Sequence, residues 1–418
     1  SVNSSYSAAT VEGDVSVGGL VGFNEGGINN SYATGSVKGD SGSTNIGGLV
    51  GANGSTIKNS YAIGRVSGVS HVSNIGGLVG ANNSGSVTDS YWNTETSGQS
   101  SSAGGAGLTT AQMKEGSWYN NWDTELTNSI TSDWYLNGGQ TAPLLRSFLT
   151  PLTVSADSQS KVYDGNATAA IVNETRTPST GTYDASKVGG SLAWSGKDVV
   201  VVGHGLTGLY TTSQQGYLIS YDANTKLMIT ARPLTATASV EDKVYDGTTA
   251  ATISGVINLN NLVGSDMVSA TYSSGAFADK NVGNNKTVTL SGITLSGTDA
   301  ANYSLAANSI TSSASITKAP LTITATSNTK TYDGNVSATS TPTVSSGIVY
   351  DAYTLSEKYD DKKAGDNKSL IPEIAFTTAS DAANYNITTV NSTGIINKAL
   401  LTAALTGTTE KVYDGNST

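Results

Sequence analysis

The sequence predicts an all-β chain: the end of a parallel β-helix with a cap, followed by a tandem array of small β-sandwich or β-grasp-like modules. Two internal repeats predict this fold class, one of short period before residue 98 and one of long period after residue 150. The composition agrees, because only 13% of the 418 residues are charged and glycine occurs 48 times, as is typical of turn-rich β-structure.

The first repeat has a period of 29 residues and begins with Gly-Gly-Leu-Val-Gly at Gly18, Gly47 and Gly76. Its later positions are an asparagine and a Ser-Tyr pair: Asn24, Asn53 and Asn82, then Tyr32, Tyr61 and Tyr91. Stacked repeats bury what one repeat cannot, so we expect Leu20, Leu49 and Leu78 in an internal column and the asparagines in an amide ladder. Gly and Asn are expected to supply turns with positive φ. Residues 1–98 are therefore predicted to form β-helix coils about 4.8 Å apart.

The ends of this repeat carry two further expectations. Ser4-Ser5-Tyr6 indicates an earlier coil, so we expect the fragment to begin inside a longer β-helix. Residues 99–150 are predicted to be the cap and junction, because a β-helix end exposes strand edges and Gly104–Leu149 concentrates aromatic residues: Trp118, Tyr119, Trp122, Trp134 and Tyr135. The alternative is an aromatic platform for sugar rings. A helical turn over Gly107–Met113 is expected, with Thr110 as its N-cap.

The second repeat is a Lys-x-Tyr-Asp-Gly motif whose tyrosines step by 82, 87 and 81 residues: Tyr163, Tyr245, Tyr332 and Tyr413. Each copy follows Pro-Leu or Leu-Leu by about ten residues, which predicts modules at 151–232, 233–319 and 320–398 and the start of a truncated fourth at 399–418. Almost no linker separates them, so we expect a semi-rigid row of modules.

Within each module, alternation such as Thr287-Val288-Thr289-Leu290 predicts half-buried strands of a β-sandwich or β-grasp-like unit. Asp-Gly after an aromatic residue indicates a tight turn, with the tyrosine anchored in the core and Gly at positive φ. This structural role is favoured over a binding role for the motif.

The two motifs together resemble known repeats over nearly the whole chain. The Gly-Gly-Leu-Val-Gly repeats look like the GLUG motif, and the Lys-x-Tyr-Asp-Gly modules resemble YDG/MBG-type repeats, which occur in large bacterial exoproteins of the filamentous-haemagglutinin type secreted by the two-partner route. The resemblance implies an extracellular or bacterial cell-surface adhesin. Its implied partners are matrix polysaccharide, host glycan or a neighbouring-cell surface, bound through the full-length protein, and an outer-membrane secretion partner. It implies no catalytic residues.

Composition excludes several function classes. A net charge of −10 without any basic run argues against nucleic-acid binding. With no cysteine there is no disulfide, thiolate metal site or Cys nucleophile. No apolar run approaches the roughly 20 residues of a membrane-spanning helix, so we expect no membrane insertion by this fragment.

Three apparent catalytic or nucleotide-binding signals are weak. Gly203-His204-Gly205-Leu206-Thr207-Gly208, with Asp222 downstream, imitates a dinucleotide fingerprint, but the following Leu209–Thr212 is β-prone and no helix is expected to open there. The two histidines, His71 and His204, lie in different repeats, so neither a triad nor a metal site is expected. The acidic residues of the coils share no obvious column, which disfavours a β-helical enzyme: Glu12, Asp14, Glu25, Asp40, Asp89 and Glu95.

A calcium site was the remaining chemical hypothesis. It would pair the acid of each Tyr-Asp-Gly with the later Asp299 or Asp381, but the first module has Ser213 at the corresponding position. We therefore expect these aspartates to be turn or cap residues and predict no cofactor and no metal.

Two functional hypotheses remain. The first is a structural stalk segment of an adhesin that mediates attachment, cell aggregation or biofilm matrix binding, without enzymatic activity. The second is direct glycan or protein binding by this segment, through polar faces or the aromatics from Trp118 to Tyr135. A β-helical polysaccharide-degrading enzyme is the least favoured alternative.

Overall fold

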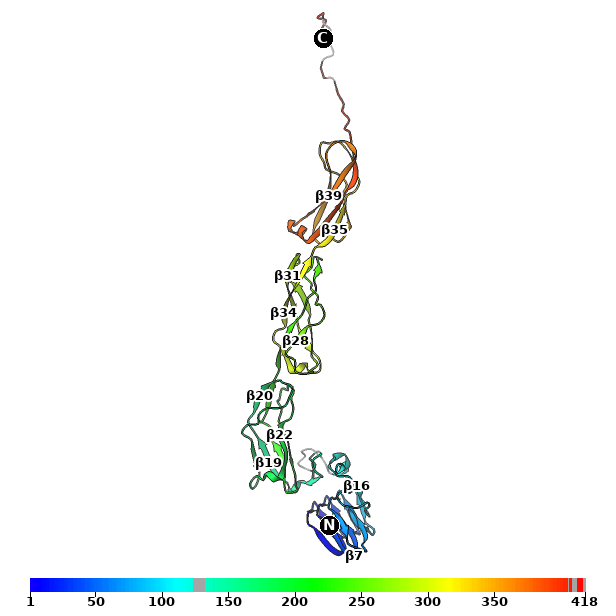
Figure 1. The fold of residues 1–418 in the computed structure, drawn as a ribbon, viewed down its shortest axis with the longest axis vertical. Helices are drawn as coiled ribbons and strands as arrows, with labels where there is room; N and C mark the ends of the chain where they lie inside the picture. The colour runs from blue at the N-terminus through cyan, green and yellow to red at the C-terminus, as the bar shows by residue number, and fades with distance from the viewer. Residues whose placement is uncertain (123–131, 138, 405, 408–411, 416–418) are drawn as a thin grey trace. The chain divides into compact units, whose positions relative to one another are not determined.

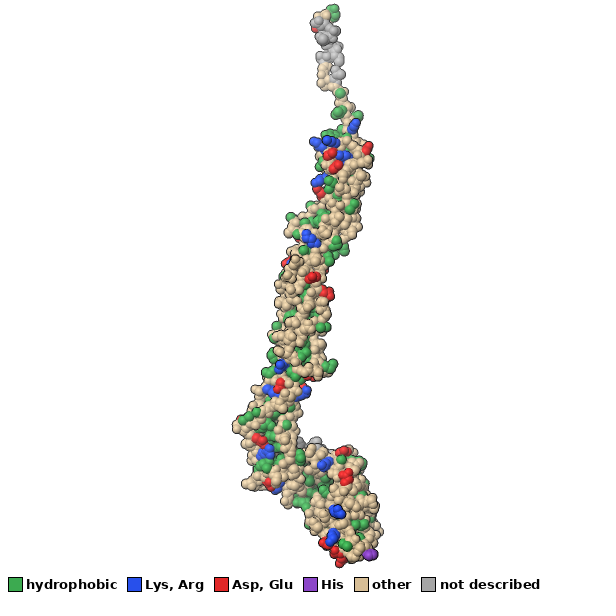
Figure 2. Space-filling view, viewed as in Figure 1, with side chains coloured by type: hydrophobic (Ala, Val, Ile, Leu, Met, Phe, Trp, Pro, Cys, Tyr) green, Lys and Arg blue, Asp and Glu red, His purple; other side chains and the backbone are tan. Residues whose placement is uncertain are grey.

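The computed structural model describes residues 1–122, 132–137, 139–404, 406–407 and 412–415 (Figure 1). The chain divides into two compact units, residues 1–230 and 231–418. Regular structure in the described ranges consists of β-strands and short 3-10 helices, which confirms the all-β prediction. Most of the surface visible in Figure 2 is neither charged nor hydrophobic, as the composition implies.

The first part of unit 1 is a parallel β-helix built from four sheets. Every strand pair in these sheets is parallel, and the partners lie about one repeat apart, for example Tyr32 with Tyr61 and Val50 with Val79. The exception is the last pair, in which Tyr91 lies opposite Ala106. The sheets comprise β1 (Val2–Asn3), β5 (Ile28–Asn29), β9 (Thr56–Lys58) and β14 (Ser86–Thr88); β2 (Tyr6–Ser7), β6 (Tyr32–Ala33), β10 (Tyr61–Ala62), β15 (Tyr91–Asn93) and β16 (Ala106–Leu108); β3 (Val11–Gly18), β7 (Val37–Gly47), β11 (Val66–Gly68) and β12 (Ser73–Gly76); and β4 (Val21–Asn24), β8 (Val50–Asn53) and β13 (Val79–Asn82).

The predicted internal columns are present. Leu49 and Leu78 are fully buried, and Leu20 packs against the same cluster at the margin. The amide ladder is also formed, because Asn24 Nδ2 donates to Asn53 Oδ1 at 2.7 Å and Asn53 Nδ2 donates to Asn82 Oδ1 at 3.0 Å. Both predictions are therefore confirmed.

The glycines of the repeat have a different role from the one expected. Those of Gly-Gly-Leu-Val-Gly do not adopt positive φ, and instead a Cβ on Gly47 would lie 2.0 Å from the carbonyl oxygen of Val50. They are required because backbones approach closely at this corner. Positive φ falls on the residue before Ser-Tyr, namely Asn30, Asn59 and Asp89, and the Asn-to-Asp change in the third copy preserves a residue type that tolerates this conformation.

The tyrosines of the repeat form a second column on the outside of the β-helix. Tyr32 and Ala33 are adjacent on one strand, so their side chains point to opposite faces, and Ala33 belongs to the internal cluster. The ring centroids of Tyr6 and Tyr32 are 5.5 Å apart and those of Tyr32 and Tyr61 are 4.7 Å apart, with nearly parallel planes. A separate cluster of apolar side chains covers this column.

The aromatic segment predicted to be the cap supplies that cover. Trp122 packs between Tyr61 and Tyr91, and Trp134 lies against Tyr32 and Tyr61. These rings therefore lie along the side of the β-helix, because they follow the column from coil to coil. The end itself is extended by residues 101–108, where Gly77 N donates to Ser101 O and β16 pairs with β15. Residues 123–131 and 138 of the predicted cap lie outside the described residues.

The expected helical turn is present as a short 3-10 helix, η1 (Gln112–Lys114), but its capping residue was predicted incorrectly. Gln112 N donates to Thr109 Oγ1 at 3.2 Å, and Thr109 N donates to Gln112 Oε1 at 2.9 Å. These two bonds hold the turn before η1, whose N-cap residue is Ala111, a residue that makes no side-chain capping bond. The Thr110 hydroxyl instead bonds to the side chain of Asn93. A second short helix, η2 (Gly116–Tyr119), and a two-stranded pair, β17 (Trp134–Tyr135) with β18 (Leu144–Leu145), complete the side cover together with η3 (Arg146–Phe148).

Three modules follow, and they share one strand plan. In each, the first strand pairs in parallel with the penultimate strand, and the strand that enters Lys-x-Tyr-Asp-Gly pairs in parallel with the last. The first module contains β19 (Thr150–Ser155), β20 (Gln159–Val162), β21 (Thr175–Pro178), η4 (Ala185–Lys187), β22 (Val188–Trp194), β23 (Leu206–Thr211), β24 (Tyr217–Tyr221) and β25 (Leu227–Thr230). We call these elements module 1.

Modules 2 and 3 belong to unit 2. Module 2 contains β26 (Arg232–Thr237), β27 (Lys243–Val244), β28 (Asn258–Asn260), β29 (Ser269–Thr271), β30 (Ser274–Phe277), β31 (Gly283–Ser291), β32 (Thr294–Ser296), η5 (Ala300–Asn302), β33 (Tyr303–Leu305) and β34 (Ser309–Thr317). Module 3 contains β35 (Ala319–Thr324), β36 (Thr329–Thr331), β37 (Thr343–Ser346), β38 (Tyr353–Tyr359), β39 (Gly365–Phe376), η6 (Ala379–Asn384), β40 (Tyr385–Val390) and β41 (Ser392–Asn397).

Modules 2 and 3 are sandwiches of two main sheets, whereas the strands of module 1 fall in three smaller sheets, β21-β19-β24, β20-β25 and β22-β23. Module 3 places β37-β35-β40 in one sheet and β36-β41-β39-β38 in another, and module 2 has the same two sheets plus the pair β29-β32. A β-grasp unit packs a helix on one sheet, whereas the helices here are single 3-10 turns in the described ranges. The two-sheet arrangement therefore decides between the alternatives that the sequence left open.

Candidate functional site: the tyrosine junctions

Each described Lys-x-Tyr-Asp-Gly motif is a turn held by its own lysine. In module 2, Lys243 Nζ donates to Asp246 Oδ1 and to Thr248 O, both at 2.8 Å, while Thr248 N donates to the same carboxylate oxygen. The equivalent bonds of Lys161 to Asp164 and Asn166 O, and of Lys330 to Asp333 and Asn335 O, hold the turns of modules 1 and 3. Gly247 has φ +75, as the predicted tight turn requires. In the fourth copy, Lys411 lies outside the described residues.

The tyrosine of this turn is buried, but its partners are in the next module. Tyr245 is 1% exposed and its hydroxyl donates to Asp351 Oδ2 of module 3 at 2.7 Å. The same carboxylate oxygen accepts a hydrogen bond from Tyr385 Oη at 3.0 Å. Around these polar groups the apolar cores of modules 2 and 3 are continuous, because Phe277 and Leu321 belong to one cluster with Tyr245. The prediction of a core anchor is confirmed for Tyr245, although the core that it anchors is shared, and for the buried Tyr163; it is wrong for Tyr332, which is exposed.

The carboxylate at this junction is compensated by a cation. Lys280 Nζ lies 2.5 Å from Asp351 Oδ1, and the Asp351 side chain is only 3% exposed. Burial alone would raise the pKa of Asp351, but hydrogen bonds from Lys280, Tyr245 and Tyr385 outweigh it and lower the pKa below its ordinary value. Burial also raises the pKa of Tyr385 to about 12, and the bond to Asp351 raises the pKa of Lys280. The charged carboxylate and the protonated phenols are thus the stable forms at neutral pH.

Backbone contacts complete the junction. Val282 N donates to Asn384 Oδ1 at 2.9 Å, so the asparagine before Tyr385 accepts a backbone hydrogen bond from the preceding module. A Cβ on Gly247 would lie 2.9 Å from Tyr350 Cβ, which means that the motif glycine also leaves room for the neighbour. We call Asp351, Asn384 and Tyr385 the socket, and Tyr245, Lys280 and the Val282 amide the plug.

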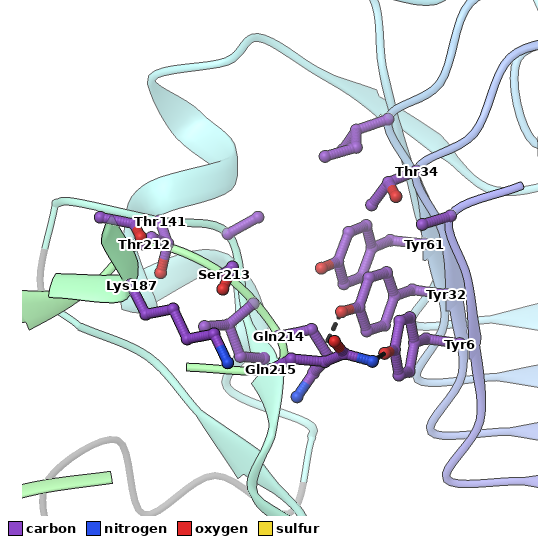
Figure 3. Close-up of a pocket in the computed structure, with 14 residues that line it drawn as sticks. Tyr6, Tyr32, Thr34, Tyr61, Thr141, Lys187, Thr212, Ser213, Gln214 and Gln215 are labelled. Carbon is purple, nitrogen blue, oxygen red and sulfur yellow. Dashed lines mark hydrogen bonds between the residues drawn. The ribbon is translucent and has the colours of Figure 1, made fainter. Parts of the chain in front are cut away.

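Unit 1 contains an analogous junction between the β-helix and module 1. An open groove of about 590 Å³ lies there, and Figure 3 shows Tyr6, Tyr32 and Tyr61 from the β-helix facing Gln214 and Gln215 from module 1. The Tyr32 hydroxyl donates to Gln214 Oε1 at 2.6 Å, and Gln215 Nε2 donates to Tyr6 Oη at 3.2 Å. Gln214 also bonds both backbone groups of Leu145 at 2.6 Å.

The phenols in this groove are already satisfied. Tyr61 Oη donates to Pro143 O at 2.6 Å, and burial raises the pKa values of Tyr32 and Tyr61 above the ordinary tyrosine value. Tyr32 is stacked between two other tyrosines, so neither of its faces is open to a sugar ring. At this groove, the β-helix and module 1 are therefore joined by hydrogen bonds between tyrosine hydroxyl groups and glutamine amide groups.

The aromatic platform predicted as an alternative is not formed by most of its residues. Tyr119, Trp122, Trp134 and Tyr135 are buried, and the Trp122 indole donates to Asp89 O at 2.6 Å. Trp118 is the exception, with 39% of its surface exposed. Replacement of Trp122 would consequently test the side cover, and not ligand binding.

The other candidate residues have structural partners or stand apart. The strand β23 opens within Gly203–Gly208, where a dinucleotide site needs a helix, which confirms that expectation. His204 Nε2 lies 2.6 Å from Asp198 O, and His71 occupies a turn at φ 57 in the β-helix. Among the coil acids, Glu12 lies opposite Lys38 in the register of β3 and β7, and the two side chains form an ion pair.

The aspartates of the calcium hypothesis have other partners as well. Asp164, Asp246 and Asp333 each pair with the lysine of their own turn, and Asp299 Oδ2 accepts from Met267 N at 2.8 Å. Asp381 lies in η6. Within the described ranges, no group of three or more His, Asp or Glu side chains is placed to hold a metal ion. The same ranges contain no helix that is long and apolar enough to cross a membrane.

Comparison with known families agrees with this architecture. Residues 230–311 and 317–393 match the YDG domain, and residues 13–38 and 42–67 match the GLUG motif. The chain is therefore a repeat protein that combines GLUG motifs with YDG domains, and its make-up is adhesin-like. No curated protein and no solved structure matches it.

Sequence reasoning missed the sockets. Asp351 was not singled out, and Tyr385 was considered only as part of a calcium candidate, although Asp-Ala-Ala-Asn-Tyr occurs in modules 2 and 3. The available signal was the position of Asp351. It lies 34 residues before Tyr385 and 106 residues after Tyr245, the motif tyrosine of the preceding module, and it bonds to both.

Proposed function

We propose that this chain is a structural stalk segment of a secreted or cell-surface bacterial adhesin of the filamentous-haemagglutinin type, exported by the two-partner route. The segment spaces a binding region elsewhere in the full-length adhesin, which attaches to matrix polysaccharide, host glycan or neighbouring cells. It has no enzymatic role in this proposal.

One observation carries the proposal: the side chains best suited to bind a ligand are used to join domains. In unit 1, the hydroxyl of Tyr32 donates a hydrogen bond to Gln214 of the next domain. In unit 2, the hydroxyl of Tyr245 donates to Asp351 of the next domain. Consecutive domains joined by buried polar contacts and a continuous core resist bending, as a spacer requires.

The test is binding of the purified chain to a panel of matrix polysaccharides and host glycans, measured by calorimetry. The spacer role predicts no binding at concentrations up to about 1 mM, the weak limit of specific recognition. Specific binding by the chain alone would overturn it.

Direct glycan binding is the second candidate, because the groove is open and is also lined by side chains other than the tyrosines, whose hydroxyls are already paired. Lys187 and Thr34 also line the groove, near Gln215. If a glycan binds, Gln215→Ala and Lys187→Ala should weaken it, whereas Lys58→Ala on an exposed β-helix strand should not. A polysaccharide-degrading activity would instead appear as product release from the same panel.

A further inference from the structure

The end of module 3 that carries Tyr332 presents the same plug that module 2 inserts into module 3. Gly283 pairs with Ile316 in module 2, and Gly365 pairs with Ile396 in module 3; the same isoleucines pair with Lys243 and Lys330 of the two motifs. This register makes Lys362 the equivalent of Lys280 and Ala364 the equivalent of Val282. Tyr332 corresponds to Tyr245.

The turn around Tyr332 is already organised as in module 2. Lys330 Nζ donates to Asp333 Oδ1 at 2.8 Å, as Lys243 does to Asp246. Gly334 has φ +83, close to the φ +75 of Gly247. Binding would therefore not need to order this turn first.

The difference between the two ends is exposure. Tyr332 is 42% exposed, whereas Tyr245 is 1% exposed. A Cβ on Gly334 would meet no atom within 4 Å, whereas one on Gly247 would meet Tyr350. Lys362 and Ala364 are also exposed. An exposed aromatic residue, an exposed lysine and an exposed residue with a backbone amide thus occupy the three positions that the socket contacts in module 2.

We propose that Tyr332, Lys362 and the Ala364 amide form a docking site for the socket end of another YDG-type module that follows in line. The socket supplies a buried carboxylate, a phenol and an amide oxygen, as Asp351, Tyr385 and Asn384 do. Charge complementarity between Lys362 and that carboxylate favours a socket end over a surface that is apolar or has no acidic side chain. The inference concerns how modules join and does not depend on the adhesin role.

The sequence at the boundary allows a direct experiment. Lys318-Ala319-Pro320-Leu321 joins modules 2 and 3, and Lys398-Ala399-Leu400-Leu401 occurs at the corresponding place after module 3. A tandem chain is made by replacing residues 399–418 with a second copy of residues 319–398. Nitration of Tyr332 by tetranitromethane is then followed by mass spectrometry in the original and tandem chains.

Docking predicts that Tyr332 is nitrated about tenfold more slowly in the tandem chain, since a site occupied nine-tenths of the time reacts through the remaining fraction. Lys362→Glu in the tandem chain should restore the original rate, because it sets two like charges together. Lys58→Glu makes the same charge change on the β-helix and should leave Tyr332 protected.

Three results would overturn the proposal. The first is equal nitration of Tyr332 in the two chains, with circular dichroism showing that the added copy is folded. The second is protection that persists in Lys362→Glu. The third is protection of Tyr332 in the original chain that grows with concentration, which would assign the site to a second molecule.

Discussion

Replacing Tyr245 with phenylalanine isolates the polar part of the junction between modules 2 and 3. The ring and its packing remain, and the lost group is one hydroxyl that donates to a buried carboxylate at 2.7 Å. A hydrogen bond to a charged group contributes about 1.5–3 kcal/mol, and the lower value applies here because Lys280 and Tyr385 still serve Asp351. A loss of about 1.5 kcal/mol lowers the ratio of docked to undocked junctions roughly tenfold.

Because the chain has no cysteine, two introduced cysteines can be spin-labelled specifically, and the docking of modules 2 and 3 can be measured by double electron–electron resonance (DEER). Spin labels on Thr289→Cys in module 2 and Thr354→Cys in module 3 occupy exposed strand positions and report the distance between the two modules. The parent chain should give one narrow distance distribution, and Tyr245→Phe should broaden it. Tyr332→Phe is the matched control, because the same motif there is exposed and its hydroxyl contributes nothing to this junction.

An unchanged distribution in Tyr245→Phe would refute the reasoning, since the hydroxyl would then be irrelevant to docking. Equal broadening in Tyr332→Phe would refute it too, because the effect would arise inside the turn and not between modules.

Three further predictions follow from the structure. The same spin-label pair should report a junction that holds from about pH 5 to 9 and loosens below about pH 4. Docking lowers the pKa of Asp351, so the charged carboxylate stabilises the docked junction at any pH above the free pKa of the group. This stabilisation is lost as the pH falls through the pKa of the docked form. Asp351→Asn should remove this acid transition. In the β-helix, Asn53→Ala should cost about 2–4 kcal/mol in urea unfolding, since it breaks two ladder bonds at a fully buried residue. Asn29→Ala, which breaks one exposed bond to Asn3 at a residue without positive φ, should cost under about 0.5 kcal/mol. Gly47→Ala should lower the thermal midpoint far more than Gly54→Ala, because the added Cβ would meet a backbone atom at 2.0 Å in the first case and at 3.4 Å in the second.

The repeats allowed the inside of the β-helix to be predicted, because a fixed period places equivalent residues in columns whatever the rest of the chain does. Leu49, Leu78 and the asparagine ladder were predicted for this reason. The outer tyrosine column was harder, since its cover comes from residues outside the repeat. Alternation of Tyr32 with Ala33 was a signal that the tyrosine faces outward, because the small residue fits the crowded interior.

The junctions could not be predicted from the motif alone. Tyr245 and Tyr332 occupy equivalent motifs, yet one ring is buried and the other is exposed. The difference depends on the domain that follows, and the partner Asp351 is 106 residues away in sequence. Local propensity explains the turn around each tyrosine, whereas only the packing of whole modules explains what the tyrosine contacts.

Module 1 shares the strand plan of modules 2 and 3 but differs from them in the residues before its penultimate strand, and this difference bears on how such a chain can lengthen. Tyr217 occupies the position of Tyr385, at the start of the penultimate strand. The residues before Tyr217 include Gln214, which accepts a hydrogen bond from the hydroxyl of Tyr32 in the β-helix. Module 3 carries the socket at one end and, in our proposal, a docking site equivalent to the plug at the other, so a duplicated copy that follows it would meet a matching surface. Module 1 is an adaptor, fitted on one side to a stack of coils. Under that proposal, gene duplication can extend the array after module 3 without new interfaces, while an insertion between the β-helix and module 1 would require two surfaces to change at once.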